Sequence, residues 1–378
     1  MYNAVIIGAG PVGLSLAEKL KHEGWDCAVV EEHSTVGKPV NCTGLISRSG
    51  VQELGLDLSD CEINRIKGAR IYSPNNEVLE VRKQGFVAHV IDREKFDRSF
   101  YAKAKKAGVD VKLDTRLLDI RNETVFVEHD GRGELIKGQV VVGADGAASK
   151  TRGLMGIKVP PQRLMHTYQV RARGSFDQDY VSLYFGGASR GFFAWVVPES
   201  NEIARIGLGT NAGNVKKAFD MFTAERGIRA QAISESSALI PIGEPLKEIV
   251  QDNLMLLGDA AFQTKATTGG GIITGLNAAG TLSELISSHF KNKTKLDDYW
   301  KMLKPLNNEL NIHWKIRSYL NSLGDEKMDA LFRKMKKAGM EEFLEKEGDM
   351  DRPGRFVGKI LRKPSMWGLF PEAMKVLR

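Results

Sequence analysis

A glycine-rich hexapeptide near the N-terminus, Gly8-Ala9-Gly10-Pro11-Val12-Gly13, has the spacing that lets a backbone approach phosphate groups. It follows an apolar segment (residues 3–7) and opens a helical pattern, and a second apolar segment ends at Glu31. N–H groups at a helix N-terminus attract phosphate oxygens, while the Glu31 carboxylate can accept hydrogen bonds from ribose hydroxyls and repels a 2′-phosphate. The pattern predicts a dinucleotide site; a glycine-rich turn in a ligand-free α/β domain is the alternative.

Three later segments add residues that could serve the same ligand. Asp92–Asp97, which includes Arg93, opens an amphipathic helix. An apolar strand at 139–142 runs into Gly143-Ala144-Asp145-Gly146, and another at 253–257 runs into Gly258-Asp259. Gly269-Gly270-Gly271 then opens a helix that continues to about residue 289. Each segment alone is explained by an ordinary turn or a surface ion pair. Their order along the chain favours one shared cofactor.

This ordered set resembles the FAD-dependent oxidoreductases of the p-hydroxybenzoate hydroxylase fold. The resemblance implies FAD as cofactor, with the glycine loop and Glu31 on its ADP half, Arg93 beside the nucleotide and Asp145-Gly146 near the pyrophosphate. It also implies that Asp259 reaches the ribityl and phosphate portion and that the triple-glycine turn faces the isoalloxazine ring. The cofactor-binding residues expected on this basis are Gly8, Gly10, Val12, Gly13, Glu31, Arg93, Leu117, Asp145, Gly146, Asp259, Gly270, Gly271 and Ile272.

Four stretches are similar to one branch of this fold, the geranylgeranyl reductases, and in particular to archaeal digeranylgeranylglycerophospholipid reductases. They are residues 38–47, 68–74, 193–198 and 268–272. The first stretch implies flavin contacts from Cys42, Thr43 and Leu45. The sequence departs from the family where Phe193 and Val197 replace the usual Tyr and Phe, and where Lys265-Ala266 replaces Asp-Pro. These departures affect the expected shape of the substrate site and place a cation near the flavin.

The resemblance implies a reductase that saturates isoprenoid C=C bonds of geranylgeranyl chains in membrane ether lipids or prenyl diphosphates, with hydride from N5 of reduced FAD. An isolated alkene accepts hydride poorly, so the site needs a positioned acid and a dry apolar cavity. Cys42 is a candidate acid, although free cysteines more often act as small buried hydrophobes. Phe193 and Trp195 either line a lipid tunnel or belong to the core between sheet and helices.

The pattern of segments predicts an α/β fold with α+β elements. We expect a discontinuous Rossmann-like FAD-binding domain (1–154 and 246–290), an antiparallel substrate-binding sheet domain (155–245) and a basic, helical C-terminal region (291–378). The composition of the 378 residues, 42% hydrophobic and 27% charged, is that of a globular protein. Three cysteines are too few for a disulfide framework and favour a reducing cytosol. No metal site is predicted.

The net charge of +7 arises entirely in residues 291–378, which carry 20 basic and 13 acidic residues. In the tail, basic residues alternate with Phe356, Ile360, Trp367, Leu369 and Phe370. Such a segment could lie on an anionic bilayer, or its helices could simply cap the substrate domain. With no membrane span and no signal peptide, we expect a cytoplasmic protein, with peripheral contact at the inner face of the membrane. No nucleic-acid reader motif accompanies the charge, so nucleic acid is not an expected partner.

The expected partners are a prenylated lipid substrate and an electron donor. A second G-x-G-x-x-G motif is absent, which leaves ferredoxin, another flavoprotein or transient NAD(P)H as the donor. Two other functions remain open at this level: a monooxygenase or halogenase of the same fold, and a non-catalytic lipid-binding protein that contains FAD.

Overall fold

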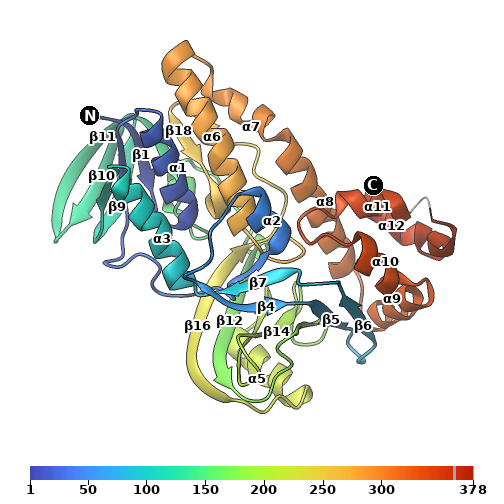
Figure 1. Ribbon diagram of the computed structural model, residues 1–378. Helices are drawn as coiled ribbons and strands as arrows, with labels where there is room; N and C mark the ends of the chain where they lie inside the picture. Colours follow the sequence, from blue (N-terminus) through green and yellow to red (C-terminus); the bar gives the residue numbers. More distant parts are fainter. Residues whose placement is uncertain (361–362, 378) are drawn as a thin grey trace.

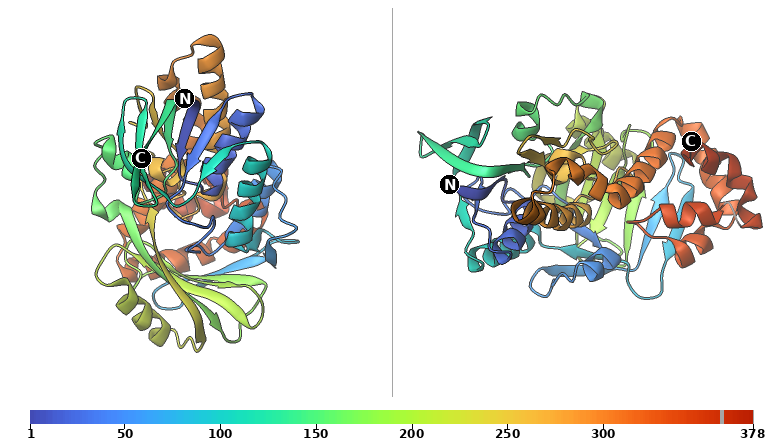
Figure 2. Two further views of the ribbon diagram at one scale, coloured as in Figure 1. Left: turned by 90° about the vertical axis from the view of Figure 1, so that its left-hand side faces the viewer. Right: turned by 90° about the horizontal axis from the view of Figure 1, so that it is seen from above.

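The computed structural model describes residues 1–360 and 363–377 and contains two large sheets joined by a small one (Figure 1). Helices flank the first sheet on one side, and a cluster of C-terminal helices lies at the far end of the second. Seen from above in Figure 2, the N-terminal sheet and the C-terminal helices lie at opposite ends of the molecule. This mixed α/β architecture confirms the predicted fold class.

The first sheet is the nucleotide-binding type, with parallel central strands. Its order is β17 (Val250–Gln251), β18 (Leu254–Leu256), β11 (Arg132–Gly143), β1 (Tyr2–Ile7), β2 (Cys27–Val30) and β8 (Asp110–Lys112), and β11 continues into a hairpin layer with β9 (Thr115–Arg121) and β10 (Thr124–His129). Both faces of β1 are buried, and because side chains alternate along a strand, successive residues pack into two different cores. Ala4 and Ile6 pack toward the helices, whereas Val5 and Ile7 pack against the hairpin layer.

Helices α1 (Pro11–His22), α3 (Arg93–Lys106) and α6 (Ile272–Asn292) cover one face of this sheet (Figure 1). Asp92 caps α3, its side chain accepting from the backbone N–H of Lys95. These elements confirm the strand–loop–helix pattern expected around the glycine hexapeptide. The N-termini of α1 and α6 lie near each other, because a Cβ on Gly275 would lie 2.7 Å from the Val12 side chain, although Ile272 comes 261 positions after Pro11 in the sequence.

The second sheet takes in strands from two separate parts of the chain. Its order is β16 (Gln231–Pro241), β12 (Leu164–Arg173), β15 (Ile203–Thr210), β14 (Ala194–Pro198), β13 (Tyr180–Tyr184), β5 (Gly68–Tyr72) and β6 (Val78–Arg82). Helix α5 (Val215–Glu225) packs on β12 and β15. The sequence placed residues 68–82 within the nucleotide-binding segment, but β5 pairs in parallel with β13. Strand β16 was not predicted.

A small three-stranded sheet lies between the two large sheets and positions the loop that carries Cys42. It contains β3 (Leu45–Ser47), β7 (Ala88–Ile91) and β4 (Glu62–Ile66), with β7 in the centre. The short helix α2 (Arg48–Glu53) follows β3, and Ser47 caps it. Helix α4 (Lys150–Leu154) and the 3₁₀ turns η1 (Pro161–Arg163) and η2 (Gly258–Ala261) lie at the other junctions.

The C-terminal region is helical, as the sequence predicts. It contains η3 (Leu296–Asp298), α7 (Tyr299–Met302), α8 (Lys304–Asn321), α9 (Asp325–Lys337), α10 (Met340–Glu347), α11 (Gly354–Ile360), η4 (Pro364–Leu369) and α12 (Phe370–Leu377). Helices α9 and α10 contact β6, and Ile360 and Leu369 are buried in the helical cluster. The side chains of Phe356, Trp367 and Phe370 lie outside the described residues, so their predicted place at a bilayer is untested. None of the described helices combines the length and apolar character that a bilayer crossing requires.

Candidate active site

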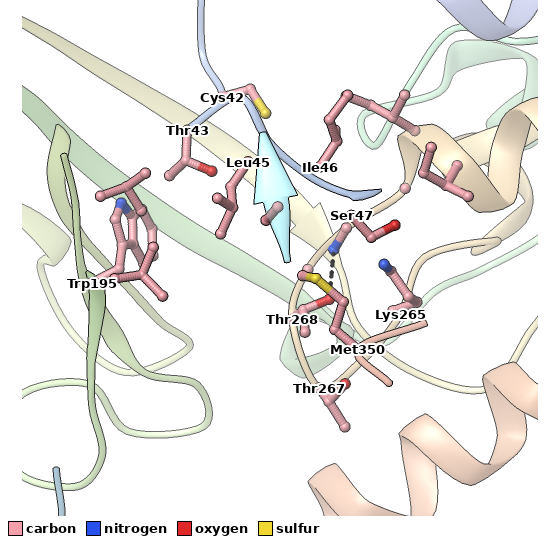
Figure 3. Close-up of a pocket in the computed structure, with 18 of the residues that line it drawn as sticks. Cys42, Thr43, Leu45, Ile46, Ser47, Trp195, Lys265, Thr267, Thr268 and Met350 are labelled. Atoms are coloured by element: carbon pink, nitrogen blue, oxygen red, sulfur yellow. Dashed lines mark hydrogen bonds between the residues drawn. The ribbon is translucent and has the colours of Figure 1, made fainter. Parts of the chain in front are cut away.

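A cavity of about 960 Å³ lies between the two large sheets. Its wall combines the N-termini of α1 and α6, the loop that carries Cys42 and the apolar face of β14 (Figure 3). The predicted site residues that line it are Gly10, Val12, Cys42, Thr43, Leu45, Arg93, Gly146, Phe193, Trp195, Asp259, Gly270, Gly271 and Ile272. Residues far apart in the sequence therefore share one chamber.

The glycine hexapeptide is shaped by close backbone packing. Gly8 has a φ of +107°, and a Cβ atom there would meet the carbonyl oxygen of Ala144 at 2.4 Å. A Cβ on Gly13 would meet the Gly8 carbonyl oxygen at 2.3 Å. Gly10 differs, because a Cβ there would have no neighbour within 4 Å. Gly8 thus lets the loop pack against the segment that follows β11, and Gly13 lets α1 pack on β1, while Gly10 leaves open space beside the cavity.

Helix α1 presents an uncapped N-terminus to that open space. Gly10 is its N-cap residue, Pro11 follows, no side chain caps the helix and no acidic residue lies in its first turn. A helix that begins this way leaves backbone N–H groups and the positive end of its dipole for an anion. The geometry fits a phosphate group at Gly10.

Glu31 directly follows β2 and is not among the residues that line the large cavity. Its carboxylate accepts hydrogen bonds from the backbone N–H of Ala9 (2.8 Å) and of His33 (3.0 Å). The carboxylate thereby holds the hexapeptide in shape. Its predicted contact with ribose hydroxyls stays a prediction.

Two predicted residues have other roles in the structure. The Leu117 side chain packs in the core with Val5 and Val125, because it lies on the inward face of β9, and its predicted contact with the cofactor stays a prediction. The Asp145 carboxylate accepts from the Ser149 hydroxyl (2.6 Å) and the Thr151 N–H (2.9 Å). Asp145 therefore shapes the loop at the start of α4, whereas its neighbour Gly146 lines the cavity.

Arg93, Asp97 and Cys42 form a charged group in the cavity wall. The Arg93 guanidinium donates to Asp97 at 3.1 and 2.9 Å. Burial alone would lower the pKa of Arg93, but the adjacent Cys42 sulfur and the Asp97 carboxylate raise it. The Gly44 N–H donates to the Cys42 sulfur at 3.3 Å. The sequence analysis missed Asp97, although its spacing four residues after Arg93 on a helix is a signal for such a pair.

The triple-glycine turn is stabilised by its own backbone. The Lys265 N–H donates to the Gly270 carbonyl (3.1 Å), and the Gly269 N–H donates to the Lys265 carbonyl (2.8 Å). Gly269 has a φ of +72°, and a Cβ on Gly271 would meet the Asp259 carboxylate at 2.3 Å. No side chain caps α6, so a second helix N-terminus opens on the same cavity.

The opposite end of the cavity is apolar. Trp195 and Val197 from β14 and Phe193 just before it line this end and are buried, with Val181 and Leu183 from β13 beside them. In Figure 3, Trp195 lies at one side of the chamber, and Thr268 and Lys265 lie across from it. The Trp195 indole N–H donates to the Gln169 side chain at 3.1 Å, so the only polar atom of the ring has a hydrogen-bond partner. These side chains belong to the core and line the chamber at once.

A buried cluster behind the triple-glycine turn includes residues that the sequence analysis did not assign to the site. Lys265 forms an ion pair with Asp351, which also accepts from the Ser47 hydroxyl. His313, on α8, donates from Nε2 to the Asp351 carbonyl (3.2 Å), so its Nδ1 accepts from the Thr267 hydroxyl (2.5 Å). No spacing rule links residues 47, 265, 313 and 351, so no sequence signal could have found the cluster.

His313 should make the stability of the protein depend on pH. Burial, followed by the Lys265 cation, lowers the pKa of His313 to about 4 from an ordinary 6.5. The unfolded chain then binds a proton more readily, so this contribution to stability is intact above the unfolded pKa and is lost as pH falls toward the folded pKa. Between about pH 7.5 and pH 5 we expect the free energy of unfolding to fall by roughly 2 kcal/mol through this residue.

Urea unfolding of the wild-type protein and of His313→Gln at both pH values measures this contribution. We expect the variant to lose about 2 kcal/mol less than the wild type over the interval. An equal loss in both proteins would show that His313 does not titrate in this way.

The fold and site together define a class of protein, a flavoprotein built on a dinucleotide-binding sheet. Two uncapped helix N-termini face one chamber, glycines leave room at both, and an apolar end adjoins them, which fits the phosphates and ring of FAD. Residues 1–309 match the family described as FAD binding domain, and the chain belongs to this family. It is an FAD-dependent oxidoreductase with FAD as its cofactor. Among the described residues, no cluster of His, Cys, Asp or Glu suits a metal ion.

Relatives extend over nearly the whole chain. An uncharacterised protein of Methanocaldococcus jannaschii is 30% identical over 96% of this chain and 95% of its own length. A digeranylgeranylglycerophospholipid reductase of Methanosarcina acetivorans is 27% identical over 90% of both chains. A solved structure, a geranylgeranyl bacteriochlorophyll reductase-like protein from Thermoplasma acidophilum, superposes with a TM-score of 0.86 at 24% identity, covering 100% of this chain and 98% of that one. The structural match shows a shared fold over the full length.

Proposed function

We propose that this oxidoreductase saturates C=C bonds in the geranylgeranyl chains of membrane ether lipids or of prenyl diphosphates. One observation carries the proposal: the apolar side chains of β13 and β14 and the triple-glycine turn line a single chamber. A prenyl chain could therefore lie in a dry pocket against the flavin. The names of relatives such as the Methanosarcina acetivorans reductase support the same chemistry.

The residues of the chain would bind the lipid, exclude water and supply the proton. Reduced FAD supplies a hydride, which goes to one alkene carbon while a proton goes to the other. Phe193, Trp195 and Val197 give the chamber a low dielectric and hold the chain in place. Cys42 lines the chamber, and we propose its thiol as the acid. The flavin contacts of Thr43 and Leu45 belong to the same proposal.

The electron donor and the membrane are the remaining parts of the proposal. The sequence carries one dinucleotide motif. We therefore propose an electron donor for which this chain needs no second nucleotide-binding domain, namely ferredoxin, another flavoprotein or a transiently bound NAD(P)H. The basic residues of 291–378 are proposed to bring the protein to the anionic inner face of the cell membrane, where the substrate lies.

Mass spectrometry of lipids tests the function directly. Cells that make unsaturated archaeal-type ether lipids would express either the wild-type protein or Gly10→Trp. We expect lipid masses to rise in steps of two hydrogens with the wild type only. Addition of an oxygen or a halogen atom would instead identify a monooxygenase or halogenase. Unchanged lipids in cells whose purified protein holds reducible FAD would contradict the proposal.

A further inference from the structure

Lys265 places a cation in the wall of the flavin chamber. Its backbone N–H and carbonyl close the triple-glycine turn, and its side chain is 5% exposed. A Cβ on Gly270 would lie 3.0 Å from the Lys265 Cε and 3.3 Å from its Nζ. Figure 3 shows the amine directed into the region between the turn and Ser47. The ammonium thus lies against the triple-glycine turn, which itself lines the chamber.

The ion pair with Asp351 has a defined direction. Lys265 lines the large chamber, whereas Asp351 is among the residues that line a separate cavity of about 380 Å³. Asp351 is held there by the hydroxyls of Ser47 and Ser49. Burial would raise the pKa of Asp351, but Lys265 and these hydroxyls outweigh that effect and lower it. The residue with the positive charge therefore lines the chamber, and the residue with the negative charge lies behind it.

We propose that the Lys265–Asp351 pair sets the reduction potential of the bound flavin by presenting its positive end to the flavin chamber. Uptake of two electrons and one proton leaves the flavin ring with one negative charge, which a nearby cation stabilises. The partial positive charge at the N-terminus of α6 acts in the same direction. Because Asp351 belongs to the segment between α10 and α11, the C-terminal region contributes to the potential of a cofactor bound by the N-terminal fold. This inference rests on FAD binding and not on the identity of the lipid.

A purely structural role for the pair would have different consequences. If the pair only tethers residues 348–353 to the turn, breaking it from either side has the same effect, a less stable protein with an unchanged flavin potential. If the pair acts through its field, the two single variants shift the potential in opposite directions, because one removes a positive charge and the other a negative charge.

The test is a redox titration of FAD-loaded, full-length protein without lipid. Lys265→Met should lower the ratio of reduced to oxidised flavin at a fixed potential about tenfold, a shift of ~30 mV for two electrons. Asp351→Asn removes the negative charge but keeps an oxygen that can accept a hydrogen bond from Lys265. It should therefore raise that ratio by a similar factor. The double variant should fall between the two. Lys301→Met makes the same charge change at an exposed ion pair outside both cavities and should leave the potential unchanged.

Shifts of the same sign in both single variants, or no shift in either, would overturn the inference. If Lys265→Met fails to retain FAD, Asp351→Asn decides alone, because it keeps the ammonium and must raise the potential. Lipid saturation plays no part in this measurement, so the inference and the proposed function can fail independently.

Discussion

Gly10→Trp is expected to abolish FAD binding while the protein stays folded. Gly10 has an ordinary φ of −70° and open space where a Cβ would project, so a tryptophan meets no strain in the backbone. The indole would fill the space in front of the uncapped N-terminus of α1, where the geometry fits a phosphate. We expect the dissociation constant for FAD to rise at least about 100-fold, or roughly 2.7 kcal/mol.

Fluorescence titration of the apoprotein with FAD, together with a thermal unfolding curve, measures both parts of this expectation. Gly133→Trp is the matched control, because Gly133 is exposed on β11 and a Cβ there also has no neighbour within 4 Å. The control should bind FAD as the wild type does. Retention of FAD by Gly10→Trp would mean that the phosphates lie elsewhere.

Arg317→Met is expected to produce the largest loss of stability. Arg317 lies on α8, is 1% exposed and donates hydrogen bonds to the carbonyls of Ala266 (3.0 Å), Phe192 (3.1 Å) and Thr267 (2.8 Å). Its guanidinium also lies over the rings of Phe192, Phe193 and Phe185. Burial lowers the pKa of Arg317 to about 9, so the group stays charged at neutral pH.

Methionine fills much of the same volume but leaves these carbonyls without donors. The cost of burying unsatisfied carbonyls outweighs the gain from removing a buried charge, and we expect a net loss of about 3 to 4 kcal/mol. FAD affinity should fall as well, because Ala266 and Thr267 lie between Lys265 and the triple-glycine turn. The free energy of unfolding in urea measures the main effect.

Arg333→Met provides the control for Arg317→Met, since Arg333 is 57% exposed and its ion pair with Glu77 is long at 3.5 Å. Surface ion pairs of this kind contribute less than about 1 kcal/mol. If Arg317→Met proves no less stable than this control, the three carbonyl contacts do not hold α8 to the site.

The glycine hexapeptide and the turns around Gly146, Asp259 and Gly270 could be predicted because local steric rules govern them. A strand followed by closely spaced glycines and a helix has few alternatives, and the structure places most of these residues around one chamber. Leu117 shows the limit of that reasoning. Its side chain points into the core because of its register on β9, and register depends on pairing with β10.

The sequence by itself predicted a dinucleotide site, the α/β fold and the helical character of the C-terminal region, since each follows from periodicity and local backbone chemistry, whereas FAD as the particular cofactor was implied by the family resemblance. Only the tertiary structure decided that β5 joins the second sheet and that α8 brings His313 and Arg317 to the triple-glycine loop. It also decided that Asp351 meets Lys265 across 86 residues of chain. These contacts join distant segments, and no local rule specifies them, because their energy depends on burial that exists only after the chain has folded.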